Sequence, residues 1–268
     1  MQPANILTIA GSDSGGGAGI EADLKTIMAL GGYGLCAITA LTAQNGLGVT
    51  GISAPEADFV KLQIATVRQG FPVKAAKTGM LFSTPIIRAV AHALADRDFP
   101  LVVDPVAASQ SGSRLLAEDA AQCLAMEILP GCDLLTPNVP EAELLSGIAI
   151  NTDVDLANAG ERLLGLGAKA VLIKGGHRPG SITVTDYLFR HGQPMLAMPQ
   201  AKVETANNHG TGCTLSAAIA TGLGQGLPMQ VAIARAQRYL NLALRRSYAP
   251  GLGCGPVNHA AGAHFGEL

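Results

Sequence analysis

The chain of 268 residues contains no tryptophan, few aromatic residues and little charge. Only 14% of its residues are charged and the formal net charge is −2, which gives no electrostatic basis for a nucleic-acid partner or an anionic membrane. Apolar residues make up 48% and glycine occurs 33 times, a composition that excludes disordered and fibrous classes and is typical of a compact α/β enzyme. We therefore expect one domain covering residues 1–268.

Cysteine is scarce and shows no recognisable spacing. The five cysteines are odd in number and form neither a Cys-x-x-Cys pair nor a zinc-ligand pattern, which favours a reducing, cytoplasmic location. No basic stretch precedes the first apolar run, so we expect no signal peptide. Two uncharged windows, residues 26–55 and 205–234, are interrupted by Gly, Asn and Gln, unlike a membrane-spanning helix.

Two common nucleotide-binding motifs are also missing. A P-loop is excluded because no Gly-Lys pair occurs in the chain. An apolar run at residues 6–10, a glycine-rich loop and a helical pattern at 20–30 do include Gly17-x-Gly19-x-x-Ala22, a weak form of the dinucleotide fingerprint. That interpretation is rejected because no acidic residue lies between Asp23 and Glu56 to bind a ribose.

Short apolar runs alternate with helical patterns along the whole chain. Strands are expected at residues 6–10, 35–41, 73–76, 101–103, 134–135 and 170–173, and helices include 20–30, 85–94, 215–223 and 229–246. Residues 181–190 and 195–198 are typical of a hairpin or of edge strands. The alternation predicts an α/β fold with a mostly parallel sheet covered by helices on both faces.

The segment 207–220 passes from a turn directly into a small-residue helical run. Gly210 and Gly212 allow close backbone approach, and the N–H groups from Thr211 onward have no intrahelical acceptor. Such a turn suits a phosphate, or the charge on a phosphoryl group in transfer. The helix dipole should lower the pKa of the Cys213 thiol and make it a base or nucleophile. The alternative is a turn that caps a packing helix and holds an inert thiol.

Gln44 follows the expected strand 35–41 in an uncharged polar turn. Ligands of open parallel sheets bind outside the carboxyl ends of strands, and an amide offers a donor beside an acceptor. Gln44 is therefore a candidate for binding a neutral heterocycle. The alternative is a turn amide that bonds its own backbone.

Charged and amide side chains end three later runs. Asp104 closes the buried run 101–103 and offers a hard oxygen to Mg²⁺ or its water, unless it only ends the strand. Asn138 and Glu141 can face one side together beside a hydrated magnesium, although they also suit an ordinary helix start. Lys174, followed by two glycines, suits contact with a phosphate.

Taken together, these motifs resemble those of the ribokinase-like superfamily and, within it, the hydroxymethylpyrimidine/phosphomethylpyrimidine kinases. The resemblance covers nearly the full chain. It implies a three-layer α/β/α ribokinase-like fold with a mostly parallel central sheet, a homodimer, and transfer of the γ-phosphoryl of ATP with Mg²⁺. The acceptors it implies are 4-amino-5-hydroxymethyl-2-methylpyrimidine and then its monophosphate. The motifs that carry it are residues 10–20, Asn138-x-x-Glu141, Lys174-Gly175-Gly176-His177 and His209-Gly210-Thr211-Gly212-Cys213-Thr214.

The same resemblance implies a role for each site residue. Pyrimidine contacts fall on Gln44, Gly11, Asp23 and Met80; magnesium and its waters on Asp104 and Glu141; nucleotide and phosphate contacts on Asn138, Lys174 and Thr211; the anion hole on Gly210, Thr211, Gly212 and Cys213. Cys213 takes the place where many sugar kinases of the superfamily carry a base aspartate. Two positions depart from the pattern: residues 107–110 are smaller and more polar than expected, and Glu21, expected to be exposed, replaces a neutral or basic residue.

Two other functions stay open at this point. Pyridoxal kinases share the fold, and some share the cysteine, which beside an aldehyde would form a hemithioacetal. A nucleotide-sensing protein without catalysis is the second alternative. The joint presence of Asp104, Glu141, Lys174 and Cys213 argues against it, because binding without transfer has less need of all four.

Overall fold

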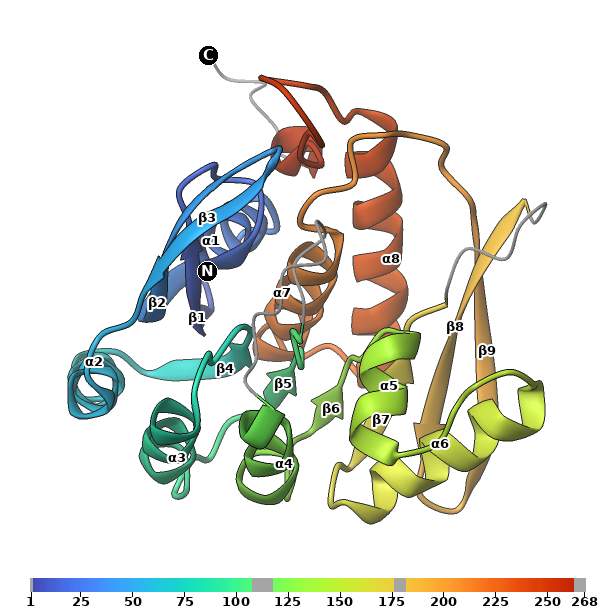
Figure 1. Cartoon of the computed structure of the whole chain (residues 1–268), viewed down its shortest axis with the longest axis horizontal. Helices are drawn as coiled ribbons and strands as arrows, with labels where there is room; N and C mark the ends of the chain where they lie inside the picture. Colours follow the sequence, from blue (N-terminus) through green and yellow to red (C-terminus); the bar gives the residue numbers. More distant parts are fainter. Residues whose placement is uncertain (1, 108–117, 176–181, 263–268) are drawn as a thin grey trace.

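The computed structural model describes residues 2–107, 118–175 and 182–262, which form one nine-stranded sheet flanked by helices (Figure 1). The strands are β1 (Asn5–Asp13), β2 (Tyr33–Asn45), β3 (Gly48–Ser53), β4 (Val73–Thr78), β5 (Leu101–Val103), β6 (Leu134–Leu135), β7 (Ala170–Ile173), β8 (Thr183–Arg190) and β9 (Gln193–Ala201). The helices are α1 (Gly19–Ala29), α2 (Ala57–Gly70), α3 (Thr84–Ala93), α4 (Glu118–Glu127), α5 (Val139–Ser146), α6 (Asp153–Gly165), α7 (Thr211–Gly224), α8 (Met229–Arg245) and the 3₁₀ turn η1 (His259–Gly262).

The sheet is mostly parallel, as predicted. Its order is β3-β2-β1-β4-β5-β6-β7-β8-β9, and every neighbouring pair from β2 to β7 is parallel. The edge strand β3 runs antiparallel to β2. The predicted hairpin is present as β8 and β9: β8 is antiparallel to β7, and β9 is antiparallel to β8.

Adjacent residues of the inner strands pack into two separate cores, one on each face of the sheet. On β1, Leu7 joins a cluster with side chains of α2, α3, α4 and α6, whereas Ile6 joins a cluster with α1, α7 and α8. Successive side chains of a strand point to opposite faces, so strands buried on both faces are apolar throughout. This confirms the predicted three-layer α/β/α arrangement.

The first β-hairpin was not predicted. β2 extends four residues beyond the expected strand 35–41, through Asn45, and its end pairs with β3 in the register Leu41↔Ser53 and Thr42↔Ile52. The turn expected at residues 42–46 is therefore wrong. Helices α2, α4 and α6 were not predicted individually. Within the described residues, no helix has the length and apolar character needed to cross a bilayer.

The parallel strands carry the site to one edge of the sheet. Their carboxyl ends lie together there, so Asp13, Gln44, Asp104 and Lys174 meet although they are far apart in the sequence. The turn that precedes α7 lies at the same edge of the sheet, because His209 and Gly210 line one cavity with these residues.

Candidate active site

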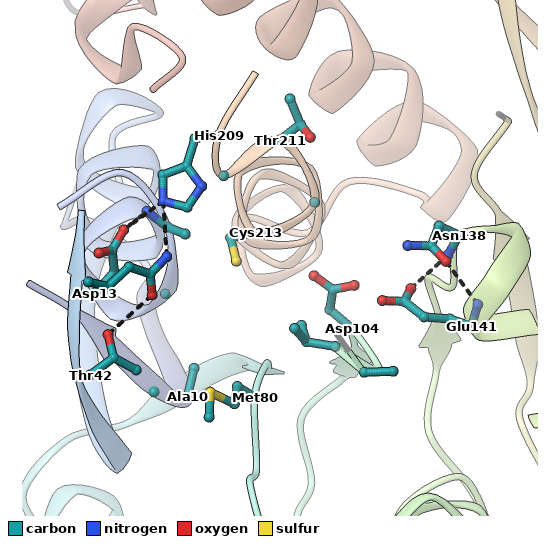
Figure 2. A pocket seen from close by; sticks show the side chains of 18 of the residues that line it. Ala10, Asp13, Thr42, Met80, Asp104, Asn138, Glu141, His209, Thr211 and Cys213 are labelled. Carbon is teal, nitrogen blue, oxygen red and sulfur yellow. Dashed lines mark hydrogen bonds and ion pairs between the residues drawn. The ribbon is translucent and has the colours of Figure 1, made fainter. Parts of the chain in front are cut away.

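A cavity of about 730 Å³ opens at the carboxyl edge of the sheet (Figure 2). It has a size usual for small-molecule sites. All the site residues predicted from the sequence line it except Asp23. Those that do are Gly11, Gln44, Met80, Asp104, Asn138, Glu141, Lys174, Gly210, Thr211, Gly212 and Cys213.

The turn that opens α7 has a backbone that only glycine supports. Gly210 is the N-cap residue with φ 82°, in the left-handed region, and a Cβ there would collide with the backbone carbonyl of Gly17. A Cβ on Gly212 would lie 3.3 Å from Lys174 Nζ and 3.5 Å from Asp104 Oδ2, so the missing side chain leaves room beside these charges. Thr211, Gly212 and Cys213 of the first turn line the cavity, and the N–H groups of Gly212 and Cys213 have no acceptor within the helix, as an anion site requires.

Lys174 stands between two nearly buried carboxylates. Its Nζ lies 3.0 Å from Asp104 Oδ1 and 3.8 Å from Glu141 Oε2. Burial alone would lower the pKa of Lys174, but Asp104 and Glu141 raise it well above its usual value. Burial raises the pKa of Glu141 and the like charge of Asp104 adds to the rise, while Lys174 opposes both. The Lys174 ammonium group therefore stays positively charged beside the carboxylate oxygens of Asp104 and Glu141.

Asn138 and Glu141 begin α5 and face the cavity at the same time. The Asn138 side chain accepts a hydrogen bond from Glu141 N at 2.9 Å, and Glu141 Oε2 accepts one from Asn138 N at 2.8 Å. This reciprocal capping fixes both side chains. The ordinary helix start and the shared orientation toward the site are thus two aspects of one arrangement, visible on the right of Figure 2.

The carboxylates fit a hydrated magnesium ion. Asp104 and Glu141 are 2% and 6% exposed, so their oxygens are desolvated and gain from a cation. In the part of the chain that the structure describes, no group of three or more His, Cys, Asp or Glu side chains converges on one point. Mg²⁺ usually keeps several waters and binds through one or two carboxylates plus substrate phosphates, and this donor set meets that description.

The environment of Cys213 contradicts the expected acidic thiol. Burial raises its pKa most, Lys77 and the Gly19 N–H lower it, and Asp23 and Asp104 raise it; the net result is a pKa of about 11. The field of a helix N-terminus is therefore outweighed by desolvation and by two carboxylates. At neutral pH the Cys213 side chain is a thiol.

Asp23 does not line the cavity, and the prediction that it contacts the pyrimidine is corrected. It is fully buried on the inner face of α1, 2.9 and 3.1 Å from Lys77 Nζ, and it accepts a hydrogen bond from Thr8 at 2.6 Å. The sequence could not show that the residue is buried in an ion pair behind the cavity wall, because its partner Lys77 lies on β4.

Asp13 and His209 belong to the sequence motifs and line the cavity, but no role was predicted for them. His209 Nε2 lies 2.8 Å from Asp13 Oδ2, and the Asp13 carboxylate also accepts hydrogen bonds from the backbone N–H groups of residues 15, 17 and 18. Burial opposes the ionised form, but these hydrogen bonds prevail and lower the pKa of Asp13. The Gln44 amide lies between His209, with Nε2 to Nε2 at 3.4 Å, and Thr42, whose Oγ1 donates to Gln44 Oε1 at 3.2 Å. Asp13 therefore joins the glycine-rich loop to the turn before α7.

The two departures from the family pattern have different outcomes. Glu21 is partly buried and not fully exposed as expected: it accepts hydrogen bonds from Ser12 Oγ at 2.6 Å and from Asp13 N at 2.7 Å. Of residues 107–110, only Ala107 is described, and it lines the cavity. Gly176 and His177 of the lysine motif also lie outside the described residues.

A second cavity of about 590 Å³ adjoins the first. It is bounded on the far side by Asp186 of β8, Gln200 of β9 and the α8 residues Gln237 and Asn241, with Leu215, Leu240 and Leu244 as apolar wall. None of these was singled out from the sequence, since they form no local motif. The two cavities share Asn138, Pro140, Lys174, Thr211 and Gly212.

The chain is similar in sequence to a family of kinases and to several of its members. Residues 13–258 match the family model described as phosphomethylpyrimidine kinase. The chain is 47% identical over 259 residues to the hydroxymethylpyrimidine/phosphomethylpyrimidine kinase of Rhizobium meliloti, covering 96% of this chain and 97% of that protein. It is 46% identical to the thiamine biosynthesis bifunctional protein ThiED of Geobacter sulfurreducens, where the match covers 97% of this chain and 53% of the longer relative.

Solved structures with the same fold include two kinds of vitamin kinase. An ADP complex of Bacillus subtilis pyridoxal kinase aligns with a TM-score of 0.87 at 33% identity, covering 97% of this chain and 98% of that one. The phosphomethylpyrimidine kinase of Clostridium difficile aligns with a TM-score of 0.78 at 40% identity, covering 89% of this chain and 98% of that one.

Proposed function

The chain belongs to the phosphomethylpyrimidine kinase family, and we propose that it phosphorylates 4-amino-5-hydroxymethyl-2-methylpyrimidine and then its monophosphate, with ATP, in thiamine biosynthesis. The observation that carries the proposal is the pair of adjoining cavities that share Lys174 and the first turn of α7. Two substrates held on either side of an anion-binding turn are what direct phosphoryl transfer needs, because such catalysis is mostly positioning and charge stabilisation.

The first cavity takes the pyrimidine. Gln44 offers a donor and an acceptor to the ring edge, Met80 supplies an apolar surface, and Gly11 lets the ring approach the backbone: a Cβ there would lie 3.1 Å from Met80 Sδ. The second cavity takes the nucleotide, whose terminal phosphate then reaches Thr211 and Gly212 at the boundary.

Charge on the moving phosphoryl group is met from two sides. Lys174 supplies a fixed positive charge, and the N–H groups of Gly212 and Cys213 at the start of α7 supply donors with no reorganisation during the reaction. Asp104 and Glu141 would hold Mg²⁺, which when bound neutralises phosphate charge. Asn138 would orient Glu141 through the capping interaction described above.

Cys213 is proposed as the base for the substrate alcohol. With a pKa of about 11, only roughly one molecule in a thousand carries the thiolate at pH 8, but that thiolate is a strong base. A loose transition state needs little proton removal early, so a small thiolate fraction is compatible with turnover.

The test is product analysis by mass spectrometry after incubation with the pyrimidine alcohol, ATP and Mg²⁺. Two added phosphoryl groups are expected; one would limit the function to the first step, and none would refute it. The structural likeness to a pyridoxal kinase supports that activity as a second candidate. Initial rates with pyridoxal and with the pyrimidine alcohol, measured side by side, decide between the two.

We also propose a homodimer in a reducing, cytoplasmic compartment. All five cysteines are free thiols, which supports the compartment. Large apolar side chains are exposed on β2, β3 and α2, including Leu41, Ile52 and Phe59, which supports self-association. Light scattering coupled to size-exclusion chromatography should give twice the chain mass, and a monomer mass would refute the dimer.

A further inference from the structure

A chain of side-chain hydrogen bonds runs along the far wall of the second cavity. Asn241 Nδ2 donates to Gln200 Oε1 at 3.1 Å, Gln200 Nε2 donates to Gln237 Oε1 at 3.3 Å, and Gln237 Nε2 donates to Asp186 Oδ2 at 2.8 Å. The four residues come from β8, β9 and α8 and all line the cavity. Gln237 and Asp186 at the inner end are 3% and 7% exposed, so water does not replace either of them as a hydrogen-bond partner.

The carboxylate at the inner end gives this chain one direction. A primary amide carries a donor on one edge and an acceptor on the other, so three amides in a row satisfy one another equally well in either direction. Asp186 accepts with both of its oxygens, because Oδ1 receives the Gly175 N–H at 2.8 Å and Oδ2 receives Gln237. Gln237 must therefore present its N–H₂ group to Asp186, and Gln200 and Asn241 follow in the same sense.

The same carboxylate is tied to the phosphate end of the site. Gly175 directly follows Lys174, whose own N–H donates to Pro137 O at 2.7 Å and whose Nζ contacts Asp104. A Cβ on Gly175 would collide with the Thr185 carbonyl, so the backbone here is held close to β8. Asp186 thus connects the wall of the second cavity to the position of Lys174.

The outer end of the chain has a defined chemistry. Because Asn241 turns its N–H₂ edge toward Gln200, its carbonyl oxygen becomes the outward group. An outward acceptor pairs with a donor on the ligand and opposes another acceptor. Among purine nucleotides, this distinguishes the 6-amino group of adenine from the 6-oxo group of hypoxanthine.

We propose that Asp186 is a positioning residue for base selection: by fixing the direction of the Gln237–Gln200–Asn241 amide chain, it makes the second cavity select a 6-amino purine. This rests on the proposed function in one respect only, namely that the second cavity holds the nucleotide. It requires no particular phosphoryl acceptor. The expected preference for the amino base is about 10- to 100-fold in affinity, the range for one buried hydrogen bond lost or opposed.

The decisive variant is Asp186→Asn. Its side-chain oxygen still accepts the Gly175 N–H, but its N–H₂ group now faces Gln237, which reverses all three amides and turns the N–H₂ of Asn241 outward. Dissociation constants for ADP and IDP, measured by calorimetry on the full-length protein with Mg²⁺, give the preference without turnover. We expect ADP to bind about 10- to 100-fold more tightly than IDP to the wild type, and the ratio to fall to near unity or below in the variant.

Two further variants separate positioning from general damage. Asp133→Asn makes the same chemical change at a carboxylate that also accepts a backbone N–H, from Leu101 at 2.8 Å, but that lines neither cavity; it should keep the wild-type ratio. Asn241→Leu removes the outward acceptor and leaves Asp186 in place, so it should also abolish the preference, and it provides the test should Asp186→Asn fail to fold.

The outcomes overturn different statements. Equal affinity of the wild type for ADP and IDP refutes the inference, as does a wild-type ratio in both Asp186→Asn and Asn241→Leu. If ADP binds tightly but the ADP to IDP affinity ratio is the same in the wild type and in both variants, only the inference is refuted, and the proposed nucleotide cavity stands. Absence of ADP binding to the wild type refutes the proposed nucleotide cavity and, with it, the inference.

Discussion

Replacing Lys77 with methionine should destabilise the protein far more than any loss of packing explains. Lys77 and Asp23 have side chains 1% and 0% exposed and lie 2.9 Å apart on β4 and α1. Burial alone would lower the pKa of Lys77, but the carboxylates of Asp23 and Asp104 raise it well above its usual value, so the lysine is charged. The variant leaves the Asp23 carboxylate buried with only Thr8 as a hydrogen-bond donor.

The magnitude follows from the burial of both partners. Removing one member of a buried ion pair costs about 3–5 kcal/mol, because the remaining charge has lost its solvent and its partner. For a chain of this size each kcal/mol lowers the melting temperature by about 2–4 °C, so Lys77→Met should lower it by roughly 6–20 °C. Replacing both residues, as Asp23→Leu with Lys77→Met, should recover most of the loss, since two apolar side chains suit the same space.

The assay is thermal and urea unfolding followed by circular dichroism, with Lys169→Met as the matched control. Lys169 pairs with Asp133 at the same 2.9 Å but is 63% exposed, so its loss should cost less than about 1 kcal/mol. Equal stability of Lys77→Met and Lys169→Met would refute the buried pair. A normal melting temperature with weakened pyrimidine binding in Asp23→Asn would instead restore the sequence-based role of Asp23.

Three further predictions concern the site and the C-terminal turn. If the Cys213 thiolate is the base, kcat/KM should rise about tenfold per pH unit from pH 7 towards 10, and a flat profile would exclude that role. Burial lowers the pKa of His259 to about 4, so on acidification the unfolded chain is protonated before the folded one and the free energy of unfolding decreases. The decrease from pH 7 to pH 5 should be about 2 kcal/mol and should vanish in His259→Gln. The same pH dependence in the variant would contradict this. Gly210→Ala should lower kcat at least tenfold more than Gly226→Ala, because both have positive φ but only Gly210 meets backbone, that of Gly17; equal rates would contradict the anion-turn geometry.

Hydrophobic periodicity was sufficient for the layers but not for the edge of the sheet. Strands buried on both faces have continuous apolar runs, and these gave β1, β4, β5 and β7 close to their observed places. β3 has the sequence Gly-Val-Thr-Gly-Ile-Ser and is mostly exposed, so it carries neither an apolar run nor a regular alternation. It is a strand because it pairs with the end of β2, and such pairing is visible only in three dimensions.

The site divides in the same way between local and distant interactions. The turn at Gly210 and the cap formed by Asn138 and Glu141 depend on residues that are close together in the sequence, so both could be predicted from it. The direction of Asp23 and the protonation of Cys213 depend on residues on other elements. The position at a helix N-terminus predicted a lowered pKa for the Cys213 thiol, but desolvation and two carboxylates raise that pKa instead.

Choice of substrate must likewise be decided by side chains in the cavity, because the fold does not order the candidates. The structural likeness is greater to a pyridoxal kinase, whereas the sequence identity is greater to a phosphomethylpyrimidine kinase. The aminopyrimidine alcohol carries an amino donor next to a ring-nitrogen acceptor, and a Gln44 amide held by Thr42 and His209 can meet both at once. Pyridoxal has an aldehyde on carbon in place of that amino group and would leave part of the amide unpaired, at a cost of about 1–3 kcal/mol. Gln44→Leu should therefore reduce kcat/KM for the pyrimidine about 10- to 100-fold and that for pyridoxal much less, and an equal loss for both substrates would show that Gln44 does not read the ring edge.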